Sequence, residues 1–212
     1  MNVQLHEEKS VAREAPIVYV VDDEQAVRDS LMLLLRSVGL AVRCYASPAE
    51  FLDDFNPQLI GCVVLDVRMP QMSGLALQEF LTGEQHDIPV IFITGHGDVQ
   101  MAVKAMREGA VDFIEKPIHD QKLLDSIQSA IQQHTERLRR RDAREDLEKR
   151  LASLTPRERN VLDMLMEGVP TKAVARQLDL SHRTVEGYRA RILEKTDVGS
   201  LTELVNLHRL AR

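Results

Sequence analysis

Four apolar runs in this sequence each end in side chains that could hold a cation or a phosphoryl group. These side chains are Asp22 and Asp23, Asp66, Thr94, and Lys116. A buried, ionised carboxylate is costly unless it is paired or binds a cation. Three neighbouring carboxylates suit Mg²⁺, which takes oxygen ligands and shares them with water and phosphate. A lysine ammonium and a threonine hydroxyl can bind phosphoryl oxygens. The set indicates magnesium-assisted phosphoryl chemistry.

Each of these residues also has a plainer interpretation when it is taken alone. Acids after a strand often begin a helix, where they suit the helix dipole. A threonine at a strand end is commonly a turn residue, and a single lysine is commonly a surface residue. What favours a functional site is that all of them follow apolar, strand-like runs.

The arrangement of elements would bring these strand ends together. Apolar, β-branched runs at 17–21, 41–46, 61–67, 89–94 and 111–114 alternate with helical patterns, the last of them from about 120 to 133. Such alternation predicts a doubly wound parallel sheet with helices on both faces, an α/β fold. The carboxyl ends of all five strands then lie along one edge, where open sheets of this kind bind ligands.

Composition divides the chain in two. The 212 residues carry a net charge of −6. Residues 1–133 hold 10 Lys and Arg against 20 Asp and Glu, whereas residues 134–212 hold 17 against 13. An acidic half and a basic half indicate two domains with different partners. No stretch is long and apolar enough for a membrane span or a signal peptide, so we expect a cytoplasmic protein without a membrane partner.

The basic half has a purely helical pattern. Residues 134–150 read as a charged linker, expected to be helical, and four short helices follow within 151–212. Thr155 with Glu158 forms a capping-box pattern, and Ser181 is placed to cap a further helix. Helices at 171–178 and 181–195, joined by a tight turn, have the proportions of a helix-turn-helix that binds DNA. The alternative is a small helical bundle with solvated arginines.

Residues 15–133 resemble the receiver domain of two-component response regulators. The resemblance rests on VVDDE (20–24), VLDVRMPQMSG (64–74), FITGHGD (92–98) and EKPI (115–118). It implies the strand order 2-1-3-4-5 and a phospho-acceptor at Asp66. It implies Mg²⁺ held by Asp22, Asp23, Asp66 and the main-chain carbonyl of Arg68. It further implies phosphoryl binding by Thr94 and Lys116, a switch role for Phe113, and a cis Lys116–Pro117 peptide. His96 reads as an exposed loop residue, with a role in phosphate lifetime as the alternative.

The stretch from Leu154 to Thr196 resembles the LuxR-type DNA-binding domain. A receiver followed by such a domain is the order found in FixJ-like regulators. The resemblance implies that the helix after Ser181 enters the major groove, with DNA contacts from Thr171, Lys172, Arg183, Thr184, Glu186, Gly187, Arg189, Ala190 and Arg191. Glu186 could accept a hydrogen bond from a cytosine amino group. Gly187 costs about 1 kcal/mol of helix propensity, which close approach to DNA would explain. A last helix at about 200–210 would form a dimer contact.

The hypothesis that follows is a DNA-binding transcription regulator, not an enzyme. A sensor histidine kinase would phosphorylate Asp66, the receiver would then dimerise through residues 99–133, and the homodimer would bind double-stranded DNA. RNA polymerase is an expected partner and activation the expected effect. The domains would be a tail (1–14), the receiver (15–133), the linker (134–150) and the helix-turn-helix domain (151–212).

Two alternatives remain open. An aspartate-nucleophile phosphatase usually carries an acid two residues after the nucleophile, but Arg68 stands there. A DNA binder that does not depend on phosphorylation would not need a complete phosphoryl pocket.

Overall fold

The computed structural model describes residues 15–95 and 99–210. The chain divides into two compact units, residues 1–136 and 137–212, which we describe separately. The tail at 1–14 and His96, for which the sequence suggested an exposed loop position, lie outside the described residues. Within the described ranges, no helix combines the length and the apolar character needed to cross a membrane.

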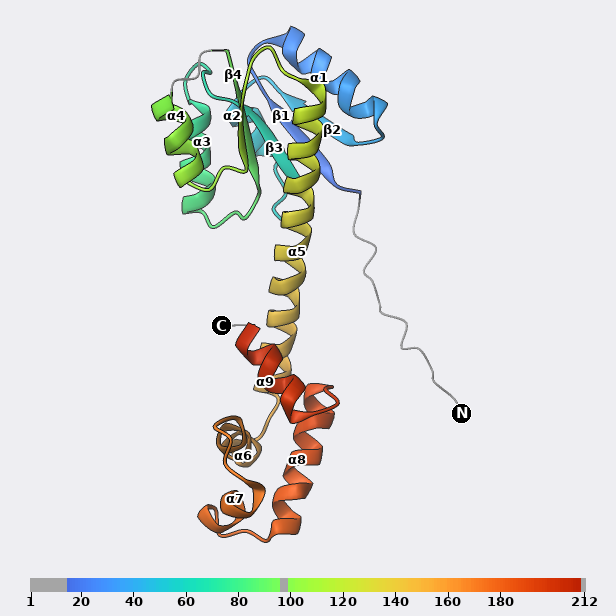
Figure 1. Cartoon of the computed structure of the whole chain (residues 1–212), viewed down its shortest axis with the longest axis vertical. Coiled ribbons are helices and arrows are strands. Elements are labelled where there is room, and N and C mark those ends of the chain that lie inside the picture. The colour runs from blue at the N-terminus through green and yellow to red at the C-terminus, as the bar shows by residue number, and fades with distance from the viewer. Residues whose placement is uncertain (1–14, 96–98, 211–212) are drawn as a thin grey trace. The chain divides into compact units, whose positions relative to one another are not determined.

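The first unit is built on a five-stranded parallel sheet (Figure 1). Its order, β2-β1-β3-β4-β5, confirms the order implied by the family resemblance. The strands are β1 (Ile17–Val21), β2 (Ala41–Tyr45), β3 (Gly61–Asp66), β4 (Val90–Thr94) and β5 (Asp112–Glu115). Strands β1, β3 and β4 are buried along their whole length, because helices cover both faces of a parallel sheet. Edge strand β2 is only partly buried.

Helices pack on both faces of this sheet. They are α1 (Gln25–Ser37), α2 (Pro48–Asp54), α3 (Gly74–Gly83), α4 (Val99–Arg107) and α5 (Asp120–Ala152). One core joins Phe51 of α2, Leu77 of α3 and Ala105 of α4 to the sheet. The other core joins Leu35 of α1 and Leu123 of α5 to the opposite face. In Figure 1, α3 and α4 accordingly lie on the other side of the sheet from α1.

Helix α5 is longer than the sequence pattern predicted. The expected end near Gln133 is wrong, because the helix continues to Ala152, whereas the prediction that the charged segment 134–150 is helical is confirmed. Ion pairs between residues four apart support this charged stretch, such as Arg144–Glu148 at 2.9 Å. The segment is also less solvated than its composition indicates, since Leu138 and Leu147 are buried.

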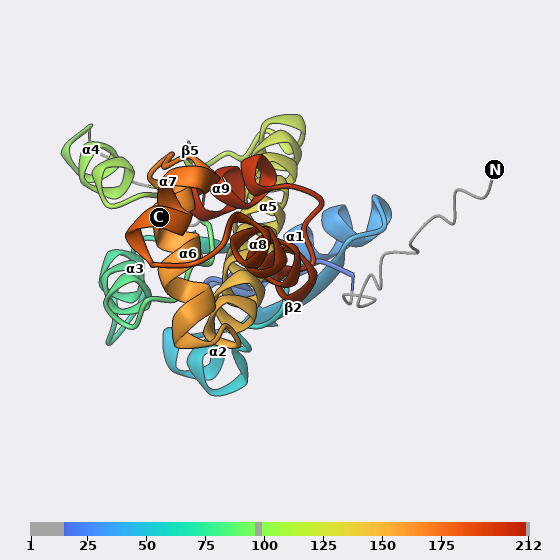
Figure 2. The ribbon, with the colours of Figure 1, turned by 90° about the horizontal axis from the view of Figure 1, so that it is seen from below.

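The second unit packs four short helices on one another, labelled in Figure 2, and Leu147 and Leu151 at the end of α5 join their core. The four helices are α6 (Pro156–Met166), α7 (Thr171–Gln177), α8 (His182–Thr196) and α9 (Leu201–Leu210). The capping box of Thr155 and Glu158 opens α6, and the Ser181 side chain accepts a hydrogen bond at the start of α8. Leu162, Val174, Val185 and Leu204 build its core.

Candidate functional site

The carboxyl edge of the sheet gathers acidic side chains around one lysine. The Lys116 Nζ lies 3.0 Å from Asp22 Oδ2, 3.1 Å from Asp66 Oδ1 and 3.2 Å from Glu24 Oε1. Asp22 is fully buried and Asp66 is 5% exposed, whereas Glu24 is on the surface. Parallel strands bring these residues together, because Asp22 follows β1, Asp66 ends β3 and Lys116 follows β5.

Burial and pairing act in opposite directions on these groups. Burial raises the pKa of the Asp66 carboxyl, and this outweighs the hydrogen bonds from Lys116 and from the Arg68 N–H, which lower it. Burial acts to lower the pKa of Lys116, but the hydrogen bonds to Asp22 and Asp66 raise it overall. The site therefore holds one firmly protonated ammonium between two carboxylates.

The two oxygens of the Asp66 carboxylate have different partners. Its Oδ1 faces Lys116, and its Oδ2 accepts a hydrogen bond of 2.6 Å from the Arg68 N–H. The backbone of Asp66 is contacted closely by Gly74, the first residue of α3, whose N–H donates to the Val67 carbonyl at 3.0 Å. A Cβ at Gly74 would lie 2.2 Å from the Asp66 carbonyl oxygen. Gly74 thus lets α3 begin directly against the loop that carries Asp66.

Gly74→Ala is expected to destabilise the first unit. A methyl group there would require the Asp66 backbone or α3 to shift, which we expect to cost about 2 kcal/mol or more of unfolding free energy. With Asp66 as the phospho-acceptor that the resemblance implies, its phosphorylation rate should fall as well. Urea unfolding and intact-mass measurement of phosphorylation would test both effects. Gly83→Ala is the matched control, because its Cβ would meet nothing within 4 Å at the other end of the same helix. A G74A chain as stable as G83A would contradict the prediction.

Two residues outside the predicted set, Glu24 and Arg28, support the acidic turn. Glu24 pairs with Lys116 from the solvent side. Arg28 Nη1 donates to the main-chain carbonyls of Asp22 and Asp23, at 2.7 Å and 2.9 Å. Arg28 lies one helical turn beyond the acidic run, and this spacing is the signal from which its role could have been predicted. Its guanidinium stabilises the turn that presents the two aspartates.

The oxygen ligands at this edge suit a hard cation. Asp22 and Asp66 both accept hydrogen bonds from one ammonium, and the exposed Asp23 follows Asp22 directly in the chain. Among the described residues, no group of three or more His, Cys, Asp and Glu side chains is arranged to hold a metal ion. The Asp22 and Asp66 carboxylates are instead each paired with the Lys116 ammonium. The donor chemistry fits Mg²⁺, which commonly binds one or two carboxylates together with water and phosphate.

The remaining pocket residues also lie at this edge. Thr94 is the last residue of β4, is 1% exposed, and accepts a hydrogen bond through its main-chain carbonyl from the Lys116 N–H. The Lys116–Pro117 peptide is cis, as the resemblance implied. Phe113 on β5 is partly buried, with its ring centroid 6.2 Å from that of Phe92. The structure thus brings together Asp22, Asp66, Thr94 and Lys116, with Phe113 on the neighbouring strand.

The second unit presents the predicted DNA contacts on the exposed side of α7 and α8. Helix α8 turns Val185 and Ile192 inward, both fully buried. The exposed residues of the predicted set are Lys172, Arg183, Thr184, Gly187, Ala190 and Arg191, and the partly exposed ones are Thr171, Glu186 and Arg189. The Glu186 carboxylate lies 3.8 Å from Arg189 and 3.9 Å from His182, so charged neighbours on its own helix flank it.

A partly buried ion pair secures α8 against α6. Lys195 Nζ lies 2.7 Å from Glu158 Oε2, and the Glu158 side chain is 4% exposed. Hydrogen bonds lower the pKa of Glu158 from an ordinary value of 4.5 to about 2. The hydrogen bond from Lys195 has the largest effect, and that from the Thr155 N–H is next. The capping box that begins α6 therefore also holds the far end of α8.

Glu158→Gln is expected to destabilise the second unit by about 1 kcal/mol or more at pH 7, because hydrogen bonds to a charged group are lost. A carboxyl whose folded-state pKa is lowered stabilises the fold above its unfolded pKa, and that contribution disappears as pH falls through the folded value. The difference between wild type and E158Q should therefore shrink from about pH 4.5 to about pH 2. Urea unfolding followed by NMR signals of α6 and α8 would measure it. An equal difference at pH 7 and pH 3 would contradict the assignment.

Family models match both units of the chain. The response regulator receiver domain matches residues 18–128. The bacterial regulatory proteins of the luxR family match residues 152–208.

Relatives of known role cover nearly the whole chain. The transcriptional regulatory protein FixJ of Bradyrhizobium diazoefficiens is 45% identical over 90% of this chain and 93% of its own. The response regulator protein TodT of Pseudomonas putida is 42% identical over 91% of this chain and 85% of its own. Among solved structures, the response regulator StyR aligns with a TM-score of 0.83 at 43% identity, covering 92% of this chain and 98% of that one. Full-length FixJ from B. japonicum aligns with a TM-score of 0.57 at 42% identity, covering 94% and 98%.

Proposed function

Because this chain belongs to the response regulators that join a receiver domain to a LuxR-type DNA-binding domain, we propose that a phosphoryl group on Asp66 controls its binding to DNA. The protein is a DNA-binding regulator of a two-component system and not an enzyme. The observation that carries the proposal is the Lys116 ammonium, which hydrogen-bonds both Asp22 and Asp66 at the ligand-binding edge of the sheet.

The proposed reaction is transfer of a phosphoryl group from a phosphohistidine of a sensor kinase. An Asp66 carboxylate oxygen forms the new bond to phosphorus, the N–P bond breaks, and the histidine nitrogen leaves with the electron pair. Asp22, Asp23, Asp66 and the main-chain carbonyl of Arg68 would hold Mg²⁺. The ion would neutralise charge on the phosphoryl oxygens. Lys116 and Thr94 would bind those oxygens, so this chain contributes mainly positioning and charge neutralisation.

Phosphorylation of Asp66 would change the surface formed by α4 through movements of residues in the pocket. Thr94 would move toward the phosphoryl group, and Phe113 would turn inward. Three apolar side chains of α4 are exposed, Val99 at 80%, Met106 at 47% and Val103 at 44%. Exposed apolar patches mark interaction sites, so we assign the face of α4 and β5 to dimerisation of the phosphorylated receiver. Phosphorylation would shift a pre-existing equilibrium toward the dimer.

DNA binding is assigned to the exposed side of the second unit. In this proposal α8 enters the major groove, Arg183, Glu186, Gly187 and Ala190 face base edges, and Thr171 and Lys172 contact phosphates. Thr184, Arg189 and Arg191 flank this face. Residues 134–212 carry only four more basic than acidic side chains. A monomer would therefore bind weakly and with strong salt dependence, so the homodimer is the proposed DNA-binding form.

The remaining assignments follow from this role. We assign residues 15–133 to the receiver and 151–212 to the DNA-binding domain, with a tail at 1–14. The helical segment 134–150 connects them, although Leu147 already packs in the core of the second unit. RNA polymerase is the proposed partner for activation of transcription. Since the DNA target lies in the cytoplasm, we place the protein there.

The test is phosphorylation followed by DNA binding of the intact chain. Wild-type protein would be incubated with acetyl phosphate and Mg²⁺, with and without a chelator, and its intact mass and oligomeric state measured. The proposal expects a phosphoryl-sized mass gain that chelation abolishes, a dimer, and tighter binding to a duplex selected from a random library. Equal DNA affinity with and without the phosphoryl group would instead support a binder that does not depend on phosphorylation. Rapid, sustained turnover of the phosphodonor would support a phosphatase.

A further inference from the structure

The last turn of α5 carries an arginine that reaches across to the end of α8. Arg150 lies between Leu147 and Leu151, which are 6% and 5% exposed and pack into the core of the second unit. Its own side chain is 34% exposed and extends out of this core. Helix α5 therefore contributes both apolar anchors and a cationic side chain to the unit that contains α8.

The Arg150 guanidinium makes three contacts. Its Nη1 donates to the main-chain carbonyl of Thr196 at 3.0 Å and lies 3.1 Å from Asp197 Oδ2. Its Nη2 lies 2.7 Å from Asp146 Oδ2, one helical turn back on α5. The ion pair with Asp146 orients the guanidinium, and the other two contacts join it to α8.

The contact with Thr196 satisfies a carbonyl at a helix end. Thr196 is the last residue of α8, and Asp197 ends the helix in the left-handed conformation, at φ 52°. Carbonyls of the last turn lack partners within the helix, and a cation there also suits the helix dipole. Thr196 is buried, whereas the Asp197 side chain is 83% exposed. Because exposed ion pairs contribute little, the bond to the Thr196 carbonyl is the stronger connection between the helices.

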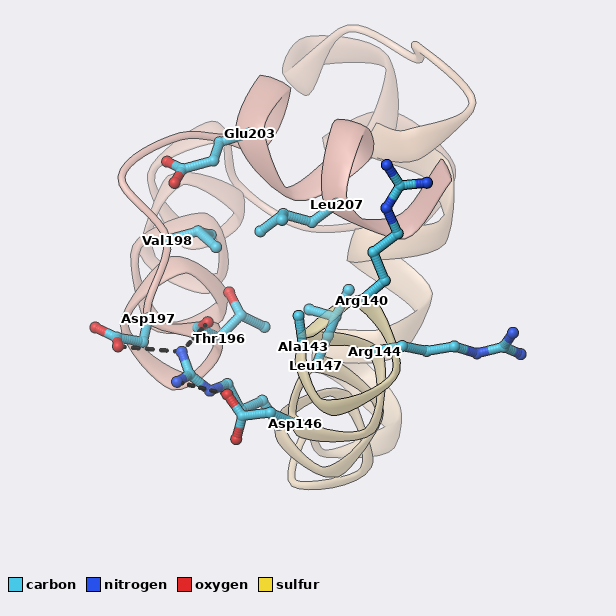
Figure 3. A pocket seen from close by; sticks show the side chains of 11 residues that line it. Arg140, Ala143, Arg144, Asp146, Leu147, Thr196, Asp197, Val198, Glu203 and Leu207 are labelled. Carbon is cyan, nitrogen blue, oxygen red and sulfur yellow. Dashed lines mark hydrogen bonds and ion pairs between the residues drawn. The ribbon is translucent and has the colours of Figure 1, made fainter. Parts of the chain in front are cut away.

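Packing beside this contact is incomplete. A groove of about 250 Å³ lies within the second unit, between α5 on one side and the α8–α9 connection with α9 on the other. Figure 3 shows Ala143 and Leu147 facing Val198 and Leu207 across it. Close-packed interiors transmit displacement through direct contact, but these side chains leave space between them. The polar contacts of Arg150 therefore join α5 to the end of α8 at the edge of this groove, in addition to the apolar packing of Leu147 and Leu151.

The same helix also belongs to the core of the first unit. Leu123, Ile127 and Ala130 of α5 are buried against the sheet, and His134 Nδ1 lies 2.9 Å from the Gly61 carbonyl oxygen at the start of β3. One continuous helix thus takes part in both cores.

We propose that Arg150 is a positioning residue, which holds the end of α8 to the last turn of α5. Through this contact a change in the receiver would reach α8, the helix proposed to enter the major groove. The inference rests on the proposed function, because it requires that phosphorylation increases DNA affinity. Arg150 does not contact DNA in this proposal, and its effect is exerted through the position of α8.

The experiment compares Arg150→Met with Arg144→Met in the full-length chain. Methionine keeps an unbranched stem and favours helix but removes every donor. Arg144 is the matched control, because its ion pair is made within α5, with Glu148 at 2.9 Å. Affinity for the selected duplex would be measured by fluorescence anisotropy at one salt concentration, with and without beryllofluoride and Mg²⁺ as the phosphoryl mimic. Arg150→Lys, which keeps one donor for the Thr196 carbonyl, is the rescue variant.

The expected result concerns the ratio of activated to basal affinity. Coupling of this kind is typically about 5- to 150-fold, and R150M should bring the ratio close to 1 while its basal affinity stays near that of wild type. R144M should keep the full ratio, and R150K should recover part of it.

Two outcomes for R150M would overturn the inference while leaving the proposed function intact. One is a full activation ratio, and the other is an equal loss of basal and activated affinity, which would mean a purely structural role. A wild-type chain that gains no affinity on activation would overturn the proposed function itself, and this inference with it.

Discussion

Asp66→Asn is expected to abolish phosphorylation and to hold DNA binding at its basal level. The asparagine side chain has nearly the same shape, and its carbonyl can still accept the hydrogen bond that the Arg68 N–H makes to Asp66 at 2.6 Å. It offers no carboxylate to attack phosphorus. Lys116 keeps its partner Asp22, at 3.0 Å, so the pocket should not collapse. Intact mass after incubation with acetyl phosphate and Mg²⁺ should show no gain, and the duplex affinity should not rise.

Stability serves as a check on this variant. Burial raises the pKa of Asp66, so the ionised carboxyl is held in the folded state at some cost. The D66N chain should therefore be at least as stable as wild type in urea unfolding. Asp53→Asn is the control, because Asp53 is an exposed acid on α2, away from the strand ends. A D66N chain that still gains a phosphoryl group would place the acceptor elsewhere, with Asp23 the next residue to replace.

Gly187→Ala is expected to change stability and DNA affinity in opposite directions. Gly187 is exposed in the interior of α8, and a Cβ there would meet nothing within 4 Å. Alanine should therefore stabilise the second unit by about 0.5–1 kcal/mol. The fold itself gives no reason for glycine here. In the proposed complex the space beside Gly187 is filled by DNA, so a methyl group should weaken binding by about tenfold or more, roughly one lost base contact.

The control for this prediction is again Gly83→Ala, a helical glycine of the first unit with equally open surroundings. It should raise stability without changing DNA affinity. The measurements are urea unfolding and anisotropy with the activated protein, at one salt concentration. Wild-type affinity in G187A would remove α8 from direct contact with base edges at this position and would require a different explanation for the glycine.

Local patterns in the sequence were enough to predict the elements that carry the site. Runs such as IVYVV and VIFIT are buried throughout because both faces of a parallel sheet are covered. The Thr155–Glu158 capping box forms as predicted, because it depends only on residues within one helical turn. Strand ends could be predicted to share an edge, since parallel strands place all their carboxyl ends on the same side.

The end of α5 could not be predicted in this way. Residues 134–150 are mostly charged, with leucines only at 138 and 147, and such a pattern predicts a solvated helical linker without showing that it continues the preceding helix. Helical propensity and ion pairs between residues four apart permit the longer helix. What makes Leu147 and Leu151 core residues is their burial against α6–α9, which depends on residues far along the chain.

By itself, the sequence determined the order of strands and helices, the two-domain organisation and the residue types available at each strand end. These features depend on periodicity and on spacing over a few residues. The tertiary structure decided which of those residues meet. Lys116 contacts Asp22 across 94 positions of sequence, and Arg150 contacts the Thr196 carbonyl across 46. Gly74 is essential to the Asp66 backbone only because α3 begins against it. Such contacts come from packing of distant segments, and a local pattern can predict that strand ends share an edge but not which atoms pair there.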